Sequence, residues 1–356
     1  MSQKNETLTL FLATIITIGL IFGGLWFLME RWGQITKSQP NSTPDPTNSP
    51  NQNPIGNVIN PNLAISSCNV PNLPQGIFNY GGSTTFAPIR RDADSVLKSI
   101  CPQFDLRYTQ PINEKPGSGT GIKMLIANQL VFSQSSRSFK PEENAEAQQK
   151  GFSLREIPVA IDGIAIAVNP TLNIPGLTVA QIKDIYIGNI TNWQQVGGPN
   201  LPIEALSRLQ EAGGTVEFFV ETVLNKQNFG NNIKYIGTTT EALRKVAVTP
   251  GAIYYASAPE VVPQCTIKPL PIGRTTSKLI TPYLNPYVPS SECPLKRNQL
   301  NNQDFRSGDY PITRNLFVIL KQNNTTDQQV GEAYANWLLT SQGQELIEKA
   351  GFVRIK

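Results

Sequence analysis

Three short segments rich in glycine and hydroxyl side chains carry the strongest chemical signal in the sequence. They lie at residues 80–86, 116–121 and 212–215, and each follows a strand-like run and precedes a helix-like run. Glycine lets the backbone approach a ligand closely, and the first amides of a helix have no partner within it. With rotatable hydroxyls beside them, such amides can surround a dehydrated oxyanion. The plainer alternative is that each Ser or Thr only caps its helix.

Two arginines could add full positive charge to such a site. Arg137 follows a serine-rich run, and Arg208 lies seven residues before Thr215. Either could equally be an ordinary surface arginine. The run at residues 117–123, GSGTGIK, lacks the spacing of a nucleotide-binding P-loop, so nucleotide hydrolysis is not expected.

Composition removes several other classes of function. The 356 residues include no histidine, which excludes a Ser-His-Asp triad, a Cys-His pair and an imidazole metal site. The formal charge of +4 is small and no run of lysine or arginine occurs, so nucleic acid is not an expected partner. We therefore predict a binding protein with no catalytic residues, metal or cofactor.

Strand-like and helix-like runs alternate from residue 76 onward. Strands are expected at 77–80, 106–109, 203–206, 253–255 and 316–320, with helices after most of them. Residues 157–168 read as two strand-like runs broken at Asp162-Gly163. This alternation predicts an α/β fold with mostly parallel sheets.

The composition of the N-terminal residues differs from that of the rest of the chain. Residues 8–29 are uncharged and apolar, and as a helix they would be about 33 Å long, enough to cross a bilayer. We expect residues 1–32 to form an uncleaved transmembrane anchor, with a cleaved secretory signal as the alternative. Residues 33–62 are rich in Pro and Asn and predict a disordered tether. The remaining residues, 63–356, would form the globular body.

Four cysteines follow the apolar stretch: Cys68, Cys101, Cys265 and Cys293. An extracytoplasmic location would let them form two disulfides. Three pairings are open, of which the sequence-local one joins Cys68 to Cys101 and Cys265 to Cys293. Buried free thiols are the alternative.

Several separated motifs resemble the phosphate-binding proteins of bacterial ABC-type phosphate importers, members of the type 2 periplasmic binding protein superfamily. They are GGSTTFAPI at 81–89, GSGTGIKMLIA at 117–127, VFSQSSRSFKPEE at 131–143, LTVAQIKDIYIGNITNW at 177–193 and NWLLTSQGQELIEKAGFV at 336–353. The resemblance covers most of the globular body, and the motifs occur in the family's order.

The resemblance implies a two-lobed α/β clamp that captures inorganic phosphate, or a related oxyanion, between its lobes. One lobe would comprise residues 76–158 and 252–356, and the other residues 159–251. The partner would be a membrane ABC permease, and the binding domain would be a monomer on the extracytoplasmic, periplasmic side. The implied ligand-binding residues are Thr84, Thr85, Phe86, Ser118, Ser136, Arg137, Arg208, Gly213, Gly214 and Thr215.

Two departures from the family pattern affect the identity of the anion. Many members have an aspartate after the serine of the third motif, whereas this chain has Ser135-Ser136-Arg137. The turn before Thr215 also has one hydroxyl fewer than the family pattern. The resemblance therefore favours an oxyanion more firmly than phosphate itself. A sensor that binds the anion without serving a transporter remains an alternative.

Overall fold

The computed structural model describes Cys68, residues 73–209 and residues 213–355. The predicted anchor at residues 1–32 and the tether at 33–62 lie outside these residues. Within the described part of the chain, no helix has both the length and the apolar character needed to cross a membrane.

A nine-stranded mixed sheet runs through the described residues, in the order β2-β1-β3-β12-β4-β8-β6-β7, with β9 also paired to β4. Parallel pairs lie toward both ends of the sheet, whereas the central pairs that involve β4 and β12 are antiparallel. The expectation of mostly parallel strands therefore holds only away from the centre. The strands are β1 (Gly76–Gly82), β2 (Phe104–Tyr108), β3 (Phe132–Ser135), β4 (Ser153–Val168), β6 (Glu204–Ser207), β7 (Lys234–Tyr235), β8 (Ala252–Ser257), β9 (Lys268–Leu270) and β12 (Thr313–Gln322).

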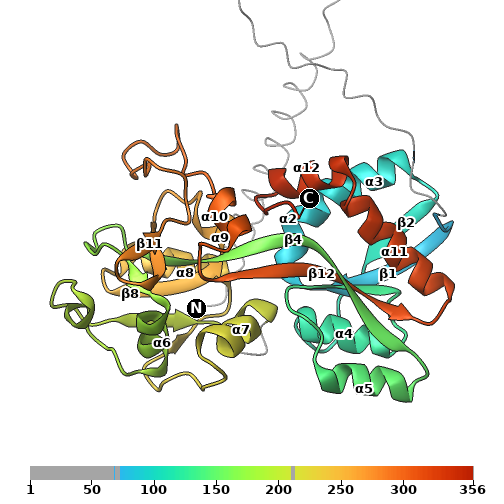
Figure 1. Cartoon of the computed structure of the whole chain (residues 1–356), viewed down its shortest axis with the longest axis horizontal. Helices are drawn as coiled ribbons and strands as arrows, with labels where there is room; N and C mark the ends of the chain where they lie inside the picture. Colours follow the sequence, from blue (N-terminus) through green and yellow to red (C-terminus); the bar gives the residue numbers. More distant parts are fainter. Residues whose placement is uncertain (1–67, 69–72, 210–212, 356) are drawn as a thin grey trace, which may run out of the picture. The chain divides into compact units, whose positions relative to one another are not determined.

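The first lobe is built on β1, β2, β3, β12 and the start of β4. Buried side chains on one face of this sheet form a core that includes Phe86, Phe132 and Tyr334, and a smaller core on Phe317 and Ile319 lies on the other. Helices cover both faces (Figure 1). They are η1 (Thr84–Phe86), α2 (Ala87–Ile89), η2 (Arg90–Asp94), α3 (Ser95–Ile100), α4 (Ser118–Ile126), α5 (Pro141–Gln149), α11 (Thr326–Leu338) and α12 (Ser341–Lys349).

The second lobe has its own core, which includes Trp193, Tyr186 and Phe219. A three-stranded sheet, in the order β11-β10-β5, belongs to the same lobe. The helices are α6 (Val179–Ile187), η3 (Trp193–Val196), α7 (Gly214–Phe218), η5 (Phe219–Val223), α8 (Thr239–Val248), α9 (Ala258–Val261) and α10 (Asn302–Ser307), and the strands of the small sheet are β5 (Leu177–Thr178), β10 (Ile272–Thr275) and β11 (Lys278–Ile280).

The chain passes between the lobes twice, along β4 and at the start of β12. Ala160 lies in the first core and Ile164 in the second, while Ile312 lies in the second and Leu316 in the first. Figure 1 shows both strands running side by side from one group of helices to the other. We call residues 73–160 and 313–355 the first lobe, and the described residues of 161–312 the second.

Two expectations from the sequence are wrong here. Residues 252–312 were expected in the first lobe, but they pack in the second core because β8 pairs with both β6 and the end of β4. The predicted break at Asp162-Gly163 is also absent, since β4 continues through both residues. Each of the two lies opposite a residue of β12, and this pairing keeps the strand extended.

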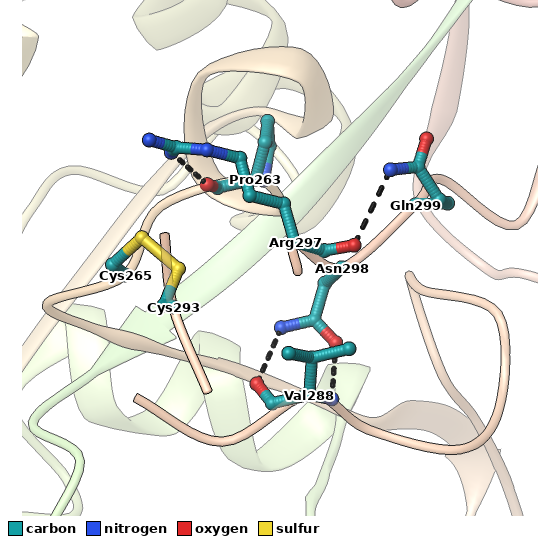
Figure 2. The surroundings of a disulfide bond; sticks show 7 residues. All are labelled: Pro263, Cys265, Val288, Cys293, Arg297, Asn298 and Gln299. Atoms are coloured by element: carbon teal, nitrogen blue, oxygen red, sulfur yellow. Dashed lines mark hydrogen bonds between the residues drawn. A yellow bond between two sulfur atoms is a disulfide. The ribbon is translucent and has the colours of Figure 1, made fainter. Parts of the chain in front are cut away.

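Both disulfides follow the sequence-local pairing, Cys68–Cys101 and Cys265–Cys293, and no described cysteine is free. Figure 2 shows the second one beside a loop that is held by side-chain bonds to the backbone. Arg297 donates to the Pro263 carbonyl at 2.8 Å, and the Asn298 amide group bonds the Val288 backbone at 2.8 and 3.0 Å.

Candidate functional site

Serine hydroxyls from three segments of the first lobe meet at one buried point. The Ser83 hydroxyl donates to Ser136 Oγ at 3.1 Å, and Ser118 Oγ and Ser136 Oγ are also 3.1 Å apart. The Ser136 amide donates to Ser118 Oγ at 3.0 Å. All three serines are at most 1% exposed. Two of the turns that the sequence singled out, at 80–86 and 116–121, therefore meet the segment after β3 at one cluster of hydroxyls.

Local backbone geometry explains how these turns come so close. Ser83 follows β1 and caps η1, its hydroxyl accepting from the Thr85 amide at 3.2 Å. Gly117 precedes α4 in extended conformation, which makes Ser118 the first residue of that helix. A Cβ atom at Gly121 would lie 2.4 Å from the Gly82 Cα, so the two turns can approach this closely only because residue 121 is glycine.

The third glycine-rich turn comes from the second lobe. Gly213 has a φ of 134°, a conformation that favours glycine, and it precedes α7. A Cβ atom on Gly214 would lie 2.4 Å from Ser118 Oγ and 2.5 Å from Ser136 Oγ. The start of α7 therefore packs directly against the serine cluster of the first lobe. This contact confirms the expectation that all three turns lie together.

A buried arginine joins hydroxyls of the two lobes. Nη2 of Arg314, on β12, donates to Thr215 Oγ1 at 2.8 Å and to Thr85 Oγ1 at 3.3 Å. Thr85 belongs to the first lobe and Thr215 to the second. The guanidinium also lies over the Phe218 ring, 5.6 Å from its centroid. One cation therefore contacts side chains from both sides of the site.

Asp162 holds this arginine in place. It lies directly opposite Arg314 on β4, and its Oδ2 accepts from Arg314 Nε at 3.0 Å and Nη2 at 2.8 Å. Its Oδ1 accepts from the Ser257 hydroxyl at 2.6 Å. Complete burial raises the pKa of Asp162, while Arg314, Ser257 and the Ala258 backbone oppose that rise.

The sequence suggested that Arg137 supplies positive charge to an oxyanion, but in the structure its guanidinium contacts two carboxylates. Its guanidinium pairs with Glu143 of its own lobe at 2.7 Å and with Glu217 of the second lobe. The Arg137 side chain is only 4% exposed. Two carboxylates thus surround it, and the pair with Glu217 bridges the lobes.

Three of the predicted ligand residues remain, Thr84, Phe86 and Arg208. Thr84 is exposed, and the Phe86 ring is buried in the first core. Arg208 follows β6 and is half-buried, and its charge acts on Tyr254 and Glu260.

Sequence reasoning missed Arg314, Asp162 and Glu260. The available signal was weak, because Arg314 lies between Thr313 and Asn315 in β12, just before the apolar run at 316–320. Asp162 was noted, but its partner is 152 residues away in the sequence. Glu260 had no signal, because its importance comes from its neighbours in space.

Glu260 lies in the short helix α9, close to Asp162, Arg314 and Arg208. Loss of solvation, as the largest cause, and the nearby Asp162 carboxylate together raise its pKa from 4.5 to about 7. Arg314 and Arg208 oppose the rise. Glu260 therefore changes charge near neutral pH beside the cation that joins the lobes.

Comparison with known families gives one match across most of the chain. The model described as "PBP superfamily domain" matches residues 67–342. This range includes all three glycine-rich turns and both strands that pass between the lobes.

Curated relatives cover a similar range. A protein of Staphylococcus epidermidis named phosphate-binding protein PstS is 27% identical over 275 residues, covering 76% of this chain and 77% of the relative. A protein of the same name from Borreliella burgdorferi is 26% identical over 288 residues, covering 79% and 90%.

Solved structures agree on the fold. A putative phosphate ABC transporter substrate-binding protein from Clostridium perfringens, with bound phosphate, superposes with a TM-score of 0.62 at 23% identity, over 79% of this chain and all of that one. An ABC-type phosphate transport receptor from Vibrio cholerae gives 0.60 at 20% identity, over 78% and 99%.

Glu217→Gln should lower the free energy of unfolding by about 1–2 kcal/mol, because it removes a partly buried charge from Arg137. Glu221→Gln is the matched control, since Glu221 also reaches across the lobes, to Lys140 at 3.8 Å, but both partners are over a third exposed. The control should change stability by less than about 1 kcal/mol. Chemical denaturation measures both, and equal losses would contradict the expected contribution of the buried pair.

Glu260→Gln should make stability less dependent on pH. The pKa of Glu260 is raised from 4.5 to about 7 in the folded protein. The folded state therefore favours the protonated form, and stability is lost as the pH rises through this window. Since glutamine stays neutral, the variant should gain stability relative to wild type between pH 5 and pH 8. Denaturation at both pH values tests this, and a constant difference would contradict it.

Proposed function

The chain belongs to the PBP superfamily, and we propose that it binds phosphate, or a closely related tetrahedral oxyanion, between its two lobes. Binding rather than catalysis is its role. The relatives named phosphate-binding protein support this ligand. The membrane permease of an ABC-type phosphate importer is the proposed recipient.

The observation that carries the proposal is the convergence of hydroxyls and helix starts from both lobes. Ser118 opens α4, and Gly214 opens α7 and packs against Ser118 and Ser136. Backbone amides at a helix start carry partial positive charge and point away from the helix. Around a common point they replace the water that an oxyanion loses on binding.

The proposed ligand set comes from the three glycine-rich turns, from the segment after β3 and from Arg208. Thr84, Thr85 and Phe86 would contribute hydroxyls or amides from the first turn, and Ser118 and Ser136 would contribute from the next two segments. The second lobe would supply the last group: Arg208, Gly213, Gly214 and Thr215. Arg137 would act at the rim of the site, where its contact with Glu217 joins the lobes in the same closed arrangement.

The absence of an aspartate at Ser136 bears on which anion is bound. A carboxylate there could accept the proton of hydrogen phosphate and repel sulfate, but a serine accepts and donates with no charge. We therefore propose that phosphate and arsenate bind most tightly and that sulfate is rejected less strongly than by relatives with the aspartate.

The binding domain is proposed to lie on the extracytoplasmic side of the membrane. Two disulfides suit an oxidising compartment. Residues 8–29 would anchor the chain and residues 33–62 would tether the binding domain near its permease. The binding domain would act as a monomer.

A protein comprising residues 63–356 should bind inorganic phosphate, detected by isothermal titration calorimetry. Thr85→Ala should weaken the affinity about tenfold or more, because it removes a hydroxyl at the meeting point of the turns. Arg208→Ala should also weaken it, because it removes positive charge from the same lobe face. No heat and no thermal shift with phosphate, arsenate or sulfate would contradict the proposal.

Loss of this chain alone should slow phosphate uptake by cells at low external phosphate, if the chain supplies a permease. The protein should stay with the membrane fraction, because residues 8–29 are uncharged and long enough to span it. Unchanged uptake together with intact phosphate binding would instead assign the protein to sensing.

A further inference from the structure

We infer that Arg314 contacts the anion directly and adds a full positive charge to the oxyanion site, and that Asp162 is the residue that positions it. This inference rests on the proposed function and identifies a ligand residue that neither the sequence motifs nor the comparisons assign.

Two other arginines near the turns, Arg137 and Arg90, already have protein partners. Arg137 donates to Glu143, to Glu217 and to the Ser138 carbonyl. Two carboxylates outweigh its single charge, so this corner carries no net positive charge for an anion. Arg90 donates to the Ser83 carbonyl at 3.0 Å and to Gln134 Oε1 at 2.7 Å, and lies over the Tyr108 ring. Arg90 therefore links the backbone of the first turn to Gln134 of β3.

Arg314 retains donors for a ligand. A guanidinium has five N–H groups. Nε and Nη2 of Arg314 serve Asp162 and the two threonine hydroxyls, whereas the buried Nη1 has no hydrogen-bond partner among the described residues. Arg314 as a whole is 5% exposed. A buried donor without a partner costs stability, and an anionic oxygen is the partner that recovers the most.

The hydroxyls that Arg314 holds are those of the proposed site. Thr85 and Thr215 come from opposite lobes and both accept from the same Nη2. An anion that contacts these hydroxyls therefore lies within reach of the guanidinium. Arg314 also differs from a loop arginine in that its strand fixes its backbone.

Asp162 is not free to accept the anion's proton, because it already accepts from Arg314 twice, from Ser257 and from the Ala258 backbone. Oδ2 accepts twice from Arg314, and Oδ1 accepts from Ser257. Asp162 instead fixes the plane of the guanidinium, so that one edge faces Asp162 and the other edge is left for the ligand.

The experiment uses the full chain in detergent and titrates inorganic phosphate by calorimetry. Arg314→Gln should lower the affinity about 100-fold, and Arg314→Lys should lower it about tenfold, since lysine keeps the charge but loses the planar fork. The rise in melting temperature on adding phosphate should shrink in the same order.

Lys321→Gln is the matched control. Lys321 is a second buried cation of β12, with its side chain 2% exposed, and it pairs with Asp327 at 2.6 Å. Its loss should reduce stability but leave the phosphate affinity within about twofold of wild type. Stability loss alone would therefore not account for weak binding by the Arg314 variants.

Asp162→Asn tests the positioning role. In the wild-type background it should weaken phosphate binding about tenfold, but in the Arg314→Gln background it should cause no further loss, because it acts through the arginine. An additional loss in the double variant would overturn the positioning role of Asp162.

Failure of the inference and failure of the proposed function give different results. If wild type binds phosphate and Arg314→Gln binds equally well, Arg314 is not a ligand residue and the inference is overturned. If wild type itself binds no phosphate, the proposed function fails and the inference fails with it.

Discussion

The ion pair between Arg314 and Asp162 is the interaction on which the rest of the site depends. It joins the two strands that pass between the lobes, at positions directly opposite each other in the sheet. Breaking a buried pair by removing one partner leaves an uncompensated charge, which costs several kcal/mol. The pair therefore fixes a cation at the junction of the lobes, where hydroxyls from both sides reach it.

Closure of the two lobes follows from where these contacts lie. Thr85 and Thr215 share one nitrogen of Arg314, and Glu217 reaches across to Arg137. A ligand shifts a two-state equilibrium only by contacts that one state offers and the other does not. Contacts that need both lobes at once are of this kind, so an anion bound as proposed would favour the closed arrangement.

Residue type and local order predicted the parts of the site that lie within one turn. Glycines and hydroxyls between a strand and a helix pick out the turns that contain Ser83, Ser118 and Gly214, because the relevant geometry spans only a few residues. Arg314 and Asp162 could not be found this way, since their contact depends on the register of two distant strands. Lys321 shows the difficulty, because it is an equally isolated buried charge on the same strand and pairs with Asp327 instead. The position of residues 252–312 was missed for the same reason, as the pairing of β8 with β4 decides it.

The path of the chain also imposes an order on biosynthesis. The second lobe is one uninterrupted stretch of sequence, so all of its strands and helices have left the ribosome once residue 312 has emerged. The first lobe has β12 between β3 and β4, and this strand comes from the last 44 residues. During translation β3 and β4 therefore leave the ribosome before β12, and the strand edges that β12 will cover have no hydrogen-bond partner until it emerges. Such open edges are the surfaces most prone to wrong pairing. For this topology, the late arrival of the C-terminal segment completes both the sheet and, through Arg314, the binding site.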